Sequence, residues 1–165
     1  MSVDVLEAVK SYLSSIVEDG NPWDEWMKTV YEAAALFGKI IHADEEEICP
    51  HYSASSALIS LISSFTPGRR NKIVTTELDY PSIGVPLAAL KKRGFDVEVI
   101  RADHGLIDVD RFREKVDEKT LLVATFHVSA LNGYMQDVRA LSEVCEAKGA
   151  YFLLDAYQSI GAVPI

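Results

Sequence analysis

The chain has 165 residues, the size of one ordinary domain, and its net charge of −9 argues against a nucleic-acid groove, because binding phosphates needs clustered Lys and Arg. No apolar run approaches the roughly 20 residues of a membrane span, and Asp4 and Glu7 stand where a signal peptide would be basic, so we expect a soluble protein without membrane contact. Cys49 and Cys145 lie far apart without CxxC spacing, which favours two reduced thiols in the core of a cytoplasmic protein.

Residues 1–46 are predicted to form an N-terminal helical segment. Apolar residues repeat at helical spacing over 3–17, and Gly20-Asn21-Pro22 ends this helix before a second one runs from near Trp23 to about Ile41. The second helix carries an apolar stripe that is most simply a face packed in a core. The stripe consists of Trp26, Val30, Ala33, Ala34 and Phe37.

From residue 47 to residue 165, short β-branched runs alternate with longer helical runs. The predicted strands are 48–49, 72–76, 97–101, 121–128 and 151–155, and the predicted helices are 55–64, 81–93, 110–116 and 137–148. This alternation predicts an α/β domain with a mostly parallel, mixed sheet that helices cover on both faces.

Two segments in the first half of this region could bind a ligand. Small hydroxyl residues open the helix that begins near Ser55, where free backbone N–H groups and hydroxyls form a natural phosphate cradle; an ordinary Ser N-cap is the simpler alternative. Tyr80 follows strand 72–76, just before a helix with Pro81 in its first turn. Its ring could stack on a planar ligand or pack over the sheet edge, and both interpretations stay open.

The later strands also end in polar residues. His127 ends strand 121–128 and is either a ligand contact or a hydrogen-bonded histidine within the sheet. Asp155 ends strand 151–155, and Gln158 follows three residues later. A carboxylate at the carboxyl end of a parallel strand lies where α/β folds bind ligands, although many such Asp residues only form turns.

These motifs follow one another in an order that resembles the class V aminotransferase family of pyridoxal-phosphate enzymes, which includes cysteine desulfurases, kynureninase and isopenicillin-epimerase-like proteins. The resemblance covers nearly the whole chain. It is carried by Ser53-Ala54-Ser55-Ser56, Glu77-Leu78-Asp79-Tyr80-Pro81-Ser82, Phe126-His127-Val128-Ser129 and Asp155-Ala156-Tyr157-Gln158.

The resemblance implies a pyridoxal 5'-phosphate site on the large domain of a pyridoxal-phosphate-dependent transferase fold. Asp155 would pair with the protonated pyridine nitrogen, Gln158 would bond the phenolic oxygen of the ring, and Tyr80 would stack on the ring. The phosphate would lie at the helix N-terminus formed by Ala54, Ser55 and Ser56. His127 matches a family motif, and its role in touching ligand or ordering the strand end stays open.

Two departures from the family pattern shape the functional expectation. Ala130 stands where the family often has Asn, and the Schiff-base lysine that follows the Asp-x-x-Gln strand in the family is absent from the sequence. We therefore expect an incomplete cofactor-binding domain over 47–165, lacking the lysine and the small C-terminal domain. Such a chain would be a fragment, a split subunit or a decayed copy, with no catalytic residue of its own and no turnover.

The resemblance also implies partners. Complete relatives act on amino acids by transamination, desulfuration or lyase chemistry at Cα or Cβ, and they place active sites at a dimer interface. We expect the chain to associate with itself or with a complementary C-terminal chain, because an incomplete sheet exposes apolar surface and a strand edge.

Two alternatives stay open. The chain could be a non-catalytic, cofactor-binding or regulatory remnant that keeps the pocket. It could also be a different nucleotide-binding α/β domain, but the sequence contains neither GxGxxG nor GxxxxGKS.

Overall fold

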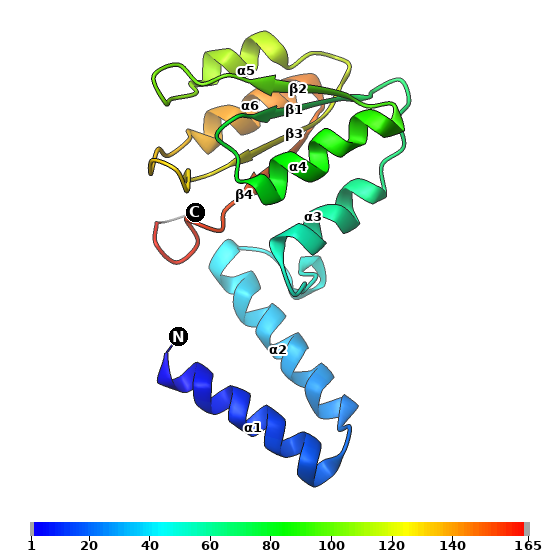
Figure 1. Cartoon of the computed structure of the whole chain (residues 1–165), viewed down its shortest axis with the longest axis vertical. Coiled ribbons are helices and arrows are strands. Elements are labelled where there is room, and N and C mark those ends of the chain that lie inside the picture. Colours follow the sequence, from blue (N-terminus) through cyan, green and yellow to red (C-terminus); the bar gives the residue numbers. More distant parts are fainter. Residues whose placement is uncertain (1, 164–165) are drawn as a thin grey trace. The chain divides into compact units, whose positions relative to one another are not determined.

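The computed structural model describes residues 2–163, and its contacts divide the chain after Pro50 into two compact units. The first unit contains α1 (Val3–Asp19), α2 (Trp23–Ile41) and a short 3-10 helix, η1 (Glu45–Glu47) (Figure 1). Ser2 caps α1 by accepting the Val5 N–H at 3.3 Å, and Gly20 ends the helix with φ of 77°. The two predicted helices are confirmed.

Aromatic side chains join α1 to α2. The Trp26 ring lies 5.3 Å from that of Tyr12 and 5.4 Å from that of Trp23, measured between centroids. The predicted core stripe of α2 is mostly wrong, because Ala34 is buried whereas Val30 and Phe37 are each 38% exposed. A unit of two helices offers too little surface to cover the whole stripe.

The second unit, from His51 on, alternates helices and strands as expected. All three strand pairs of its four-stranded sheet are parallel, in the order β2-β1-β3-β4. The elements are α3 (Ala54–Ser63), β1 (Lys72–Thr76), α4 (Pro81–Ala89), η2 (Leu90–Arg93), β2 (Asp96–Ile100), α5 (Val109–Lys115), β3 (Thr120–Phe126), α6 (Val138–Lys148) and β4 (Tyr151–Asp155).

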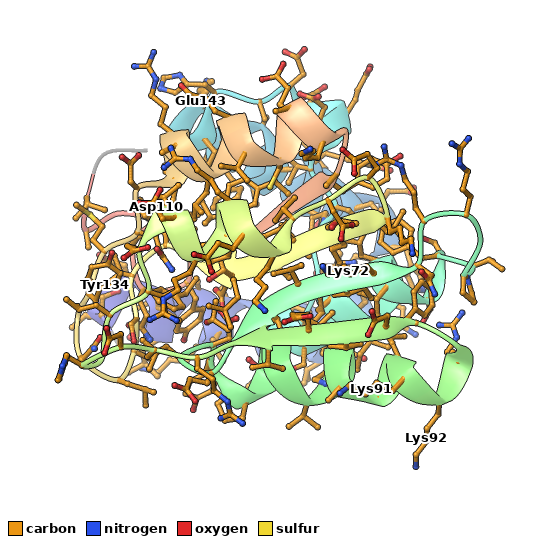
Figure 2. All side chains as sticks on the ribbon, turned by 90° about the horizontal axis from the view of Figure 1, so that it is seen from above. Lys72, Lys91, Lys92, Asp110, Tyr134 and Glu143 are labelled. Atoms are coloured by element: carbon orange, nitrogen blue, oxygen red, sulfur yellow. The ribbon has the colours of Figure 1, made fainter. Side chains whose placement is uncertain are left out.

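Alternate strand residues point to opposite faces of this sheet, so each face has its own core. One core packs α3, α4 and η2 against Ile73, Val97 and Leu122, and the other packs α5 and α6 against Val74 and Val123. Figure 2 shows the resulting layers, with α5 and α6 above the strands and α4 below them. The predicted α/β fold with helices on both faces is confirmed.

Three local predictions were wrong. Ile48 has extended backbone dihedrals, but residues 48–49 join no strand, and Cys49 is exposed rather than in the core. Both residues lie in the irregular segment between η1 and α3. The predicted helix 81–93 is divided, because its last turn tightens into the 3-10 helix η2 before Gly94, whose φ is 91°.

The strand order places a crevice between the two central strands. The chain moves from β1 to the neighbouring edge strand β2 and then crosses to the other side of β1 to form β3. In open parallel sheets, ligands bind outside the carboxyl ends of the strands at such a reversal. Among residues 2–163, no helix is both long enough and apolar enough to cross a membrane.

Candidate functional site

A pocket of about 230 Å³ opens at the carboxyl edge of the sheet. Its walls come from the N-terminus of α3, the turn between β1 and α4, and the ends of β3 and β4. It is lined by Ala54, Leu78, Tyr80, Ser82, Phe126, Val128, Ala130, Asp155, Tyr157 and Gln158. Segments more than 100 residues apart in the sequence thus meet at the crevice that the strand order creates.

Asp155 is the last residue of β4, and its side chain is half-buried in this wall. Oδ1 accepts the Tyr157 N–H at 3.0 Å, and the backbone oxygen accepts the His127 N–H at 2.8 Å. These bonds hold the carboxylate at the pocket, while Oδ2 has no hydrogen bond from the described residues. The carboxylate can therefore pair with a protonated ring nitrogen. Gln158 lines the same wall and offers both an amide donor and an acceptor.

Tyr80 is the residue before α4; it lines the pocket and is 55% exposed. Pro81 at the first helical position fixes the backbone here. The backbone carbonyl oxygen of Tyr80 accepts hydrogen bonds from the N–H groups of Ile83 and Gly84 at 2.8 and 3.1 Å. The ring is thus held by a rigid helix start and is free to stack on a planar ligand.

The start of α3 is divided between two hollows. Ala54 lines the pocket, whereas Ser55 and Ser56 line an adjacent hollow. Ser53 caps the helix by accepting the Ser56 N–H at 3.1 Å, and the Ser56 hydroxyl donates back to the Ser53 oxygen at 2.8 Å. The cap leaves the N–H groups of Ala54 and Ser55 without an acceptor among the described residues, which is the usual arrangement of an anion-binding helix end.

His127 lies apart from the other predicted site residues. Along the end of β3, Phe126 and Val128 line the pocket, whereas His127 lines a separate hollow on the other side with Gln136. His127 is 5% exposed, and its Nδ1 has no hydrogen-bond partner in the described structure. Its backbone joins β4 to the loop after β3, since its N–H donates to Asp155 and its oxygen accepts the Gln136 N–H at 2.9 Å.

Asp79, a carboxylate in the turn after β1 that is 8% exposed, was not predicted to belong to the site. It accepts hydrogen bonds from Thr75, Thr76 and Phe126. Burial raises the pKa of Asp79, while these hydrogen bonds act in the opposite direction. Two Thr residues shortly before an Asp are the signal that could have indicated it, because hydroxyl and backbone donors close to a carboxylate satisfy it locally.

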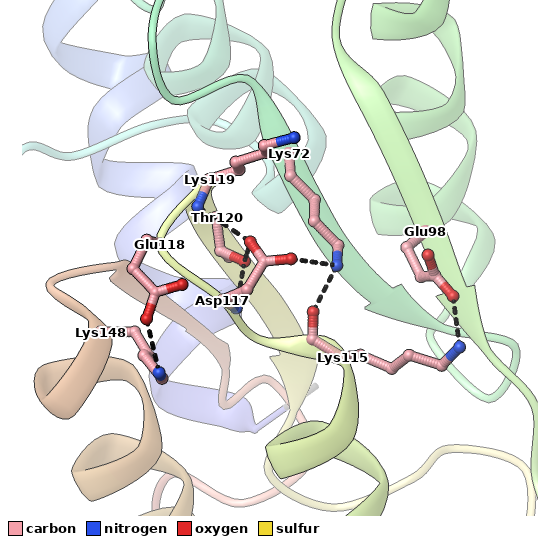
Figure 3. Close-up of polar contacts among 8 residues, drawn as sticks. All are labelled: Lys72, Glu98, Lys115, Asp117, Glu118, Lys119, Thr120 and Lys148. Atoms are coloured by element: carbon pink, nitrogen blue, oxygen red, sulfur yellow. Dashed lines mark hydrogen bonds and ion pairs between the residues drawn. The ribbon is translucent and has the colours of Figure 1, made fainter.

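The lysines of the second unit lie at the opposite, amino edge of the sheet. Helices run antiparallel to the strands here, so the cations that favour helix C-termini gather at the amino ends of the strands. Figure 3 shows Lys72 bonded to Asp117, Lys115 paired with Glu98 and Lys148 paired with Glu118, at N–O distances of 3.1, 2.9 and 2.7 Å. Within residues 51–163, no lysine lines the pocket.

Comparisons with known proteins agree with this geometry. The family model "Aminotransferase class-V" matches residues 3–165. The uncharacterized aminotransferase YcbU of Bacillus subtilis is 32% identical over 161 residues, which cover 98% of this chain and 43% of YcbU. A probable cysteine desulfurase of Methanothermobacter thermautotrophicus is 31% identical over 139 residues, covering 84% of this chain and 35% of that protein.

Solved structures share the fold. DndA from Streptomyces lividans superposes with a TM-score of 0.84 at 26% identity, covering 99% of this chain and 48% of DndA. The cystine C-S lyase C-DES, in complex with its product cysteine persulfide, has a TM-score of 0.87 at 16% identity, covering 100% of this chain and 46% of C-DES. The chain spans less than half the length of these relatives. With the family model matching nearly every residue, the chain belongs to the class V aminotransferase family.

Proposed function

We propose that the pocket binds pyridoxal 5'-phosphate and that residues 47–165 form an incomplete cofactor-binding domain of a class V enzyme acting on amino acids. The observation that carries the proposal is Asp155, which is held at the carboxyl end of β4 in the wall of the pocket and whose Oδ2 accepts no hydrogen bond from the described residues. Tyr80, Gln158 and the first turn of α3 surround the same space. Family membership supports the choice of cofactor.

Each residue would act on a different part of the cofactor. The Asp155 carboxylate holds the proton on the pyridine nitrogen. Gln158 forms a hydrogen bond with the phenolic oxygen, a bond that the methyl side chain of Ala130 cannot make. Tyr80 stacks on the ring, and the N–H groups of Ala54 and Ser55 bind the phosphate. The bound cofactor supplies an electron sink for the pair of electrons released at the Cα of an amino acid.

The Ser55 and Ser56 hydroxyls line the neighbouring hollow, so in this proposal the α3 backbone, rather than these side chains, provides most of the phosphate contact. His127 would act through its backbone bond to Asp155, which holds the ends of β3 and β4 together.

We propose that catalysis needs a lysine from outside residues 2–163, in the same polypeptide or in a second chain. The lysines of the second unit support this, because they lie at the amino edge of the sheet, opposite the pocket. Residues 1–165 alone are then expected to bind cofactor without turning over an amino acid. With the lysine present, the substrate would undergo transamination, desulfuration or lyase chemistry.

We also propose that the chain associates along β4, with a second copy or with a complementary chain. In the described sheet, β4 pairs only with β3, so its outer edge presents unpaired backbone groups. Tyr151 at its start is 63% exposed, and Phe152 and Leu153 are only half-buried.

The test of the cofactor site is a binding titration with deoxypyridoxine 5'-phosphate, a cofactor analogue without the aldehyde, which therefore cannot react with surface lysines. Asp155→Asn is expected to raise the Kd about tenfold or more, because a charge-assisted hydrogen bond to the ring nitrogen is lost. Asp96→Asn is the matched control, since Asp96 is an exposed carboxylate at the amino edge of the same sheet. Equal affinity in Asp155→Asn and in the unchanged chain would show that the role of Asp155 is wrong.

A further inference from the structure

The ladder between β1 and β3 ends before either strand does. Its last pair joins Val74 to Val123, whereas β1 stays paired with β2 as far as Thr76, and β3 stays paired with β4 as far as Phe126. The carboxyl ends of the two central strands therefore diverge, at the place where the strand order reverses.

The Asp79 carboxylate fills this divergence. Oδ1 accepts the Phe126 N–H from β3 at 2.9 Å. Oδ2 accepts three bonds from β1, namely the Thr76 N–H at 2.7 Å and the hydroxyls of Thr75 and Thr76 at 2.8 and 2.9 Å. A carboxylate that is 8% exposed is tolerated when hydrogen bonds replace its water, and here donors from both strands do so. Asp79 thus links two strand ends that do not bond each other directly.

The residues around this link form the pocket. Leu78 and Tyr80, the neighbours of Asp79 in the chain, line one wall, and Phe126 lines another. The Asp79 carboxylate therefore lies between the two strand ends that carry these walls.

We propose that Asp79 is a positioning residue that holds the ligand pocket at its working width by bridging the diverging ends of β1 and β3. This inference rests on the proposed function, because the ligand whose fit it controls is the pyridoxal phosphate of that proposal. Asp79 acts through Tyr80 and Phe126 and makes no ligand contact of its own.

The test compares Asp79→Asn with the unchanged chain. The amide keeps the side-chain shape, but its NH2 group cannot accept a hydrogen bond, so an N–H of Thr76 or Phe126 loses its acceptor. We expect the Kd for deoxypyridoxine 5'-phosphate to rise about tenfold or more. In the chain without ligand, we expect faster hydrogen exchange at one of these amides and shifted amide resonances of Tyr80 and Asp155.

Asp117→Asn is the matched control. Asp117 also bridges β1 and β3, but at the amino edge, where it accepts bonds from Lys72, Lys119 and Thr120 (Figure 3). Its substitution is expected to lower the melting temperature and leave the Kd and the Tyr80 resonance unchanged. If Asp79→Asn does not fold, Thr75→Val, which removes one bond to Asp79 with little change of shape, replaces it.

The outcomes separate the two proposals. A lower melting temperature for Asp79→Asn, with an unchanged Kd and unchanged Tyr80 and Asp155 resonances, would overturn the positioning role. If the unchanged chain does not bind the analogue, the proposed function fails, and the resonances of the unliganded chain alone decide whether Asp79 sets the pocket.

Discussion

Side-chain parity along β3 decides which residues face the pocket. Phe126 and Val128 line it, and His127 between them faces the other side, because successive residues of an extended strand point to opposite faces. The sequence places His127 at the right strand end, but the face that lines the pocket is known only once the helices and neighbouring strands are in place.

Cys145 is a residue whose burial has a measurable consequence. It lies on α6, is 2% exposed in the core between the sheet and the helices α5 and α6, and burial raises the pKa of its thiol from 9.0 to about 11. At pH values between 9.0 and about 11, the thiol is protonated in the folded state and largely deprotonated in the unfolded state. The free energy of unfolding should therefore fall as the pH rises above 9, by at most about 1.4 kcal/mol per pH unit from this group.

Urea denaturation at several pH values between 8 and 11 measures this slope. Other groups titrate in the same range, so the slope of the unchanged chain is compared with that of Cys145→Ala, which should be shallower. Cys49→Ala, which removes an exposed thiol, should keep the original slope. Identical slopes in the unchanged chain and in Cys145→Ala would contradict the prediction.

Helix ends in this fold need particular residues. α6 ends at Gly149, whose φ is 63° and whose N–H bonds the oxygens of Cys145 and Glu146. Its own oxygen accepts Arg70 Nη1 at 2.6 Å, and an added Cβ would come within 3.3 Å of that guanidinium. Gly149→Ala is expected to reduce the free energy of unfolding by about 1–2 kcal/mol, because an L side chain is strained in the left-handed region.

Gly84→Ala is the control for this helix prediction. Gly84 lies inside α4, and an added Cβ would meet nothing within 4 Å. This change is expected to raise stability by about 0.5–1 kcal/mol, because Ala loses less backbone freedom than Gly on entering a helix. Thermal or urea unfolding of both variants measures the difference, and a destabilisation of similar size in both would refute the role of the Gly149 conformation.

Helix direction explains why the lysines lie at one edge of the sheet and the proposed phosphate site lies at the other. Because α5 and α6 run against the strands, their C-terminal ends and the lysines there lie at the amino edge of the sheet. The N-terminus of α3, where we propose that the phosphate binds, lies at the carboxyl edge of the sheet beside the pocket.

The proposed association along β4 predicts how the apparent mass of the chain depends on protein concentration. Because an edge strand with half-buried apolar side chains gains hydrogen bonds and burial by pairing, we expect the apparent mass to rise with protein concentration. Sedimentation velocity over a hundredfold concentration range measures this. A single sharp monomer species throughout the range would contradict the proposed association.

The order of elements, the α/β class and the motifs that mark the family could all be predicted from the sequence. Those features depend on local periodicity, caps and turn residues, which neighbouring residues in the chain specify. The sequence did not indicate that residues 48–49 form no strand, because strand formation depends on distant contacts. It also did not indicate that residues 81–93 change helix type before Gly94, because α-helical and 3-10 turns share the same local signals.

Which polar residues share the site could not be predicted and became clear from the folded domain. It brings Ala54, Tyr80, Asp155 and Gln158 to one pocket, and it places His127 and the Ser55 and Ser56 side chains in adjoining hollows. It also shows that Asp79 bridges β1 and β3. Strand pairing and the reversal of strand order bring segments from distant parts of the chain together. The sequence of one segment does not specify which distant segments it will contact.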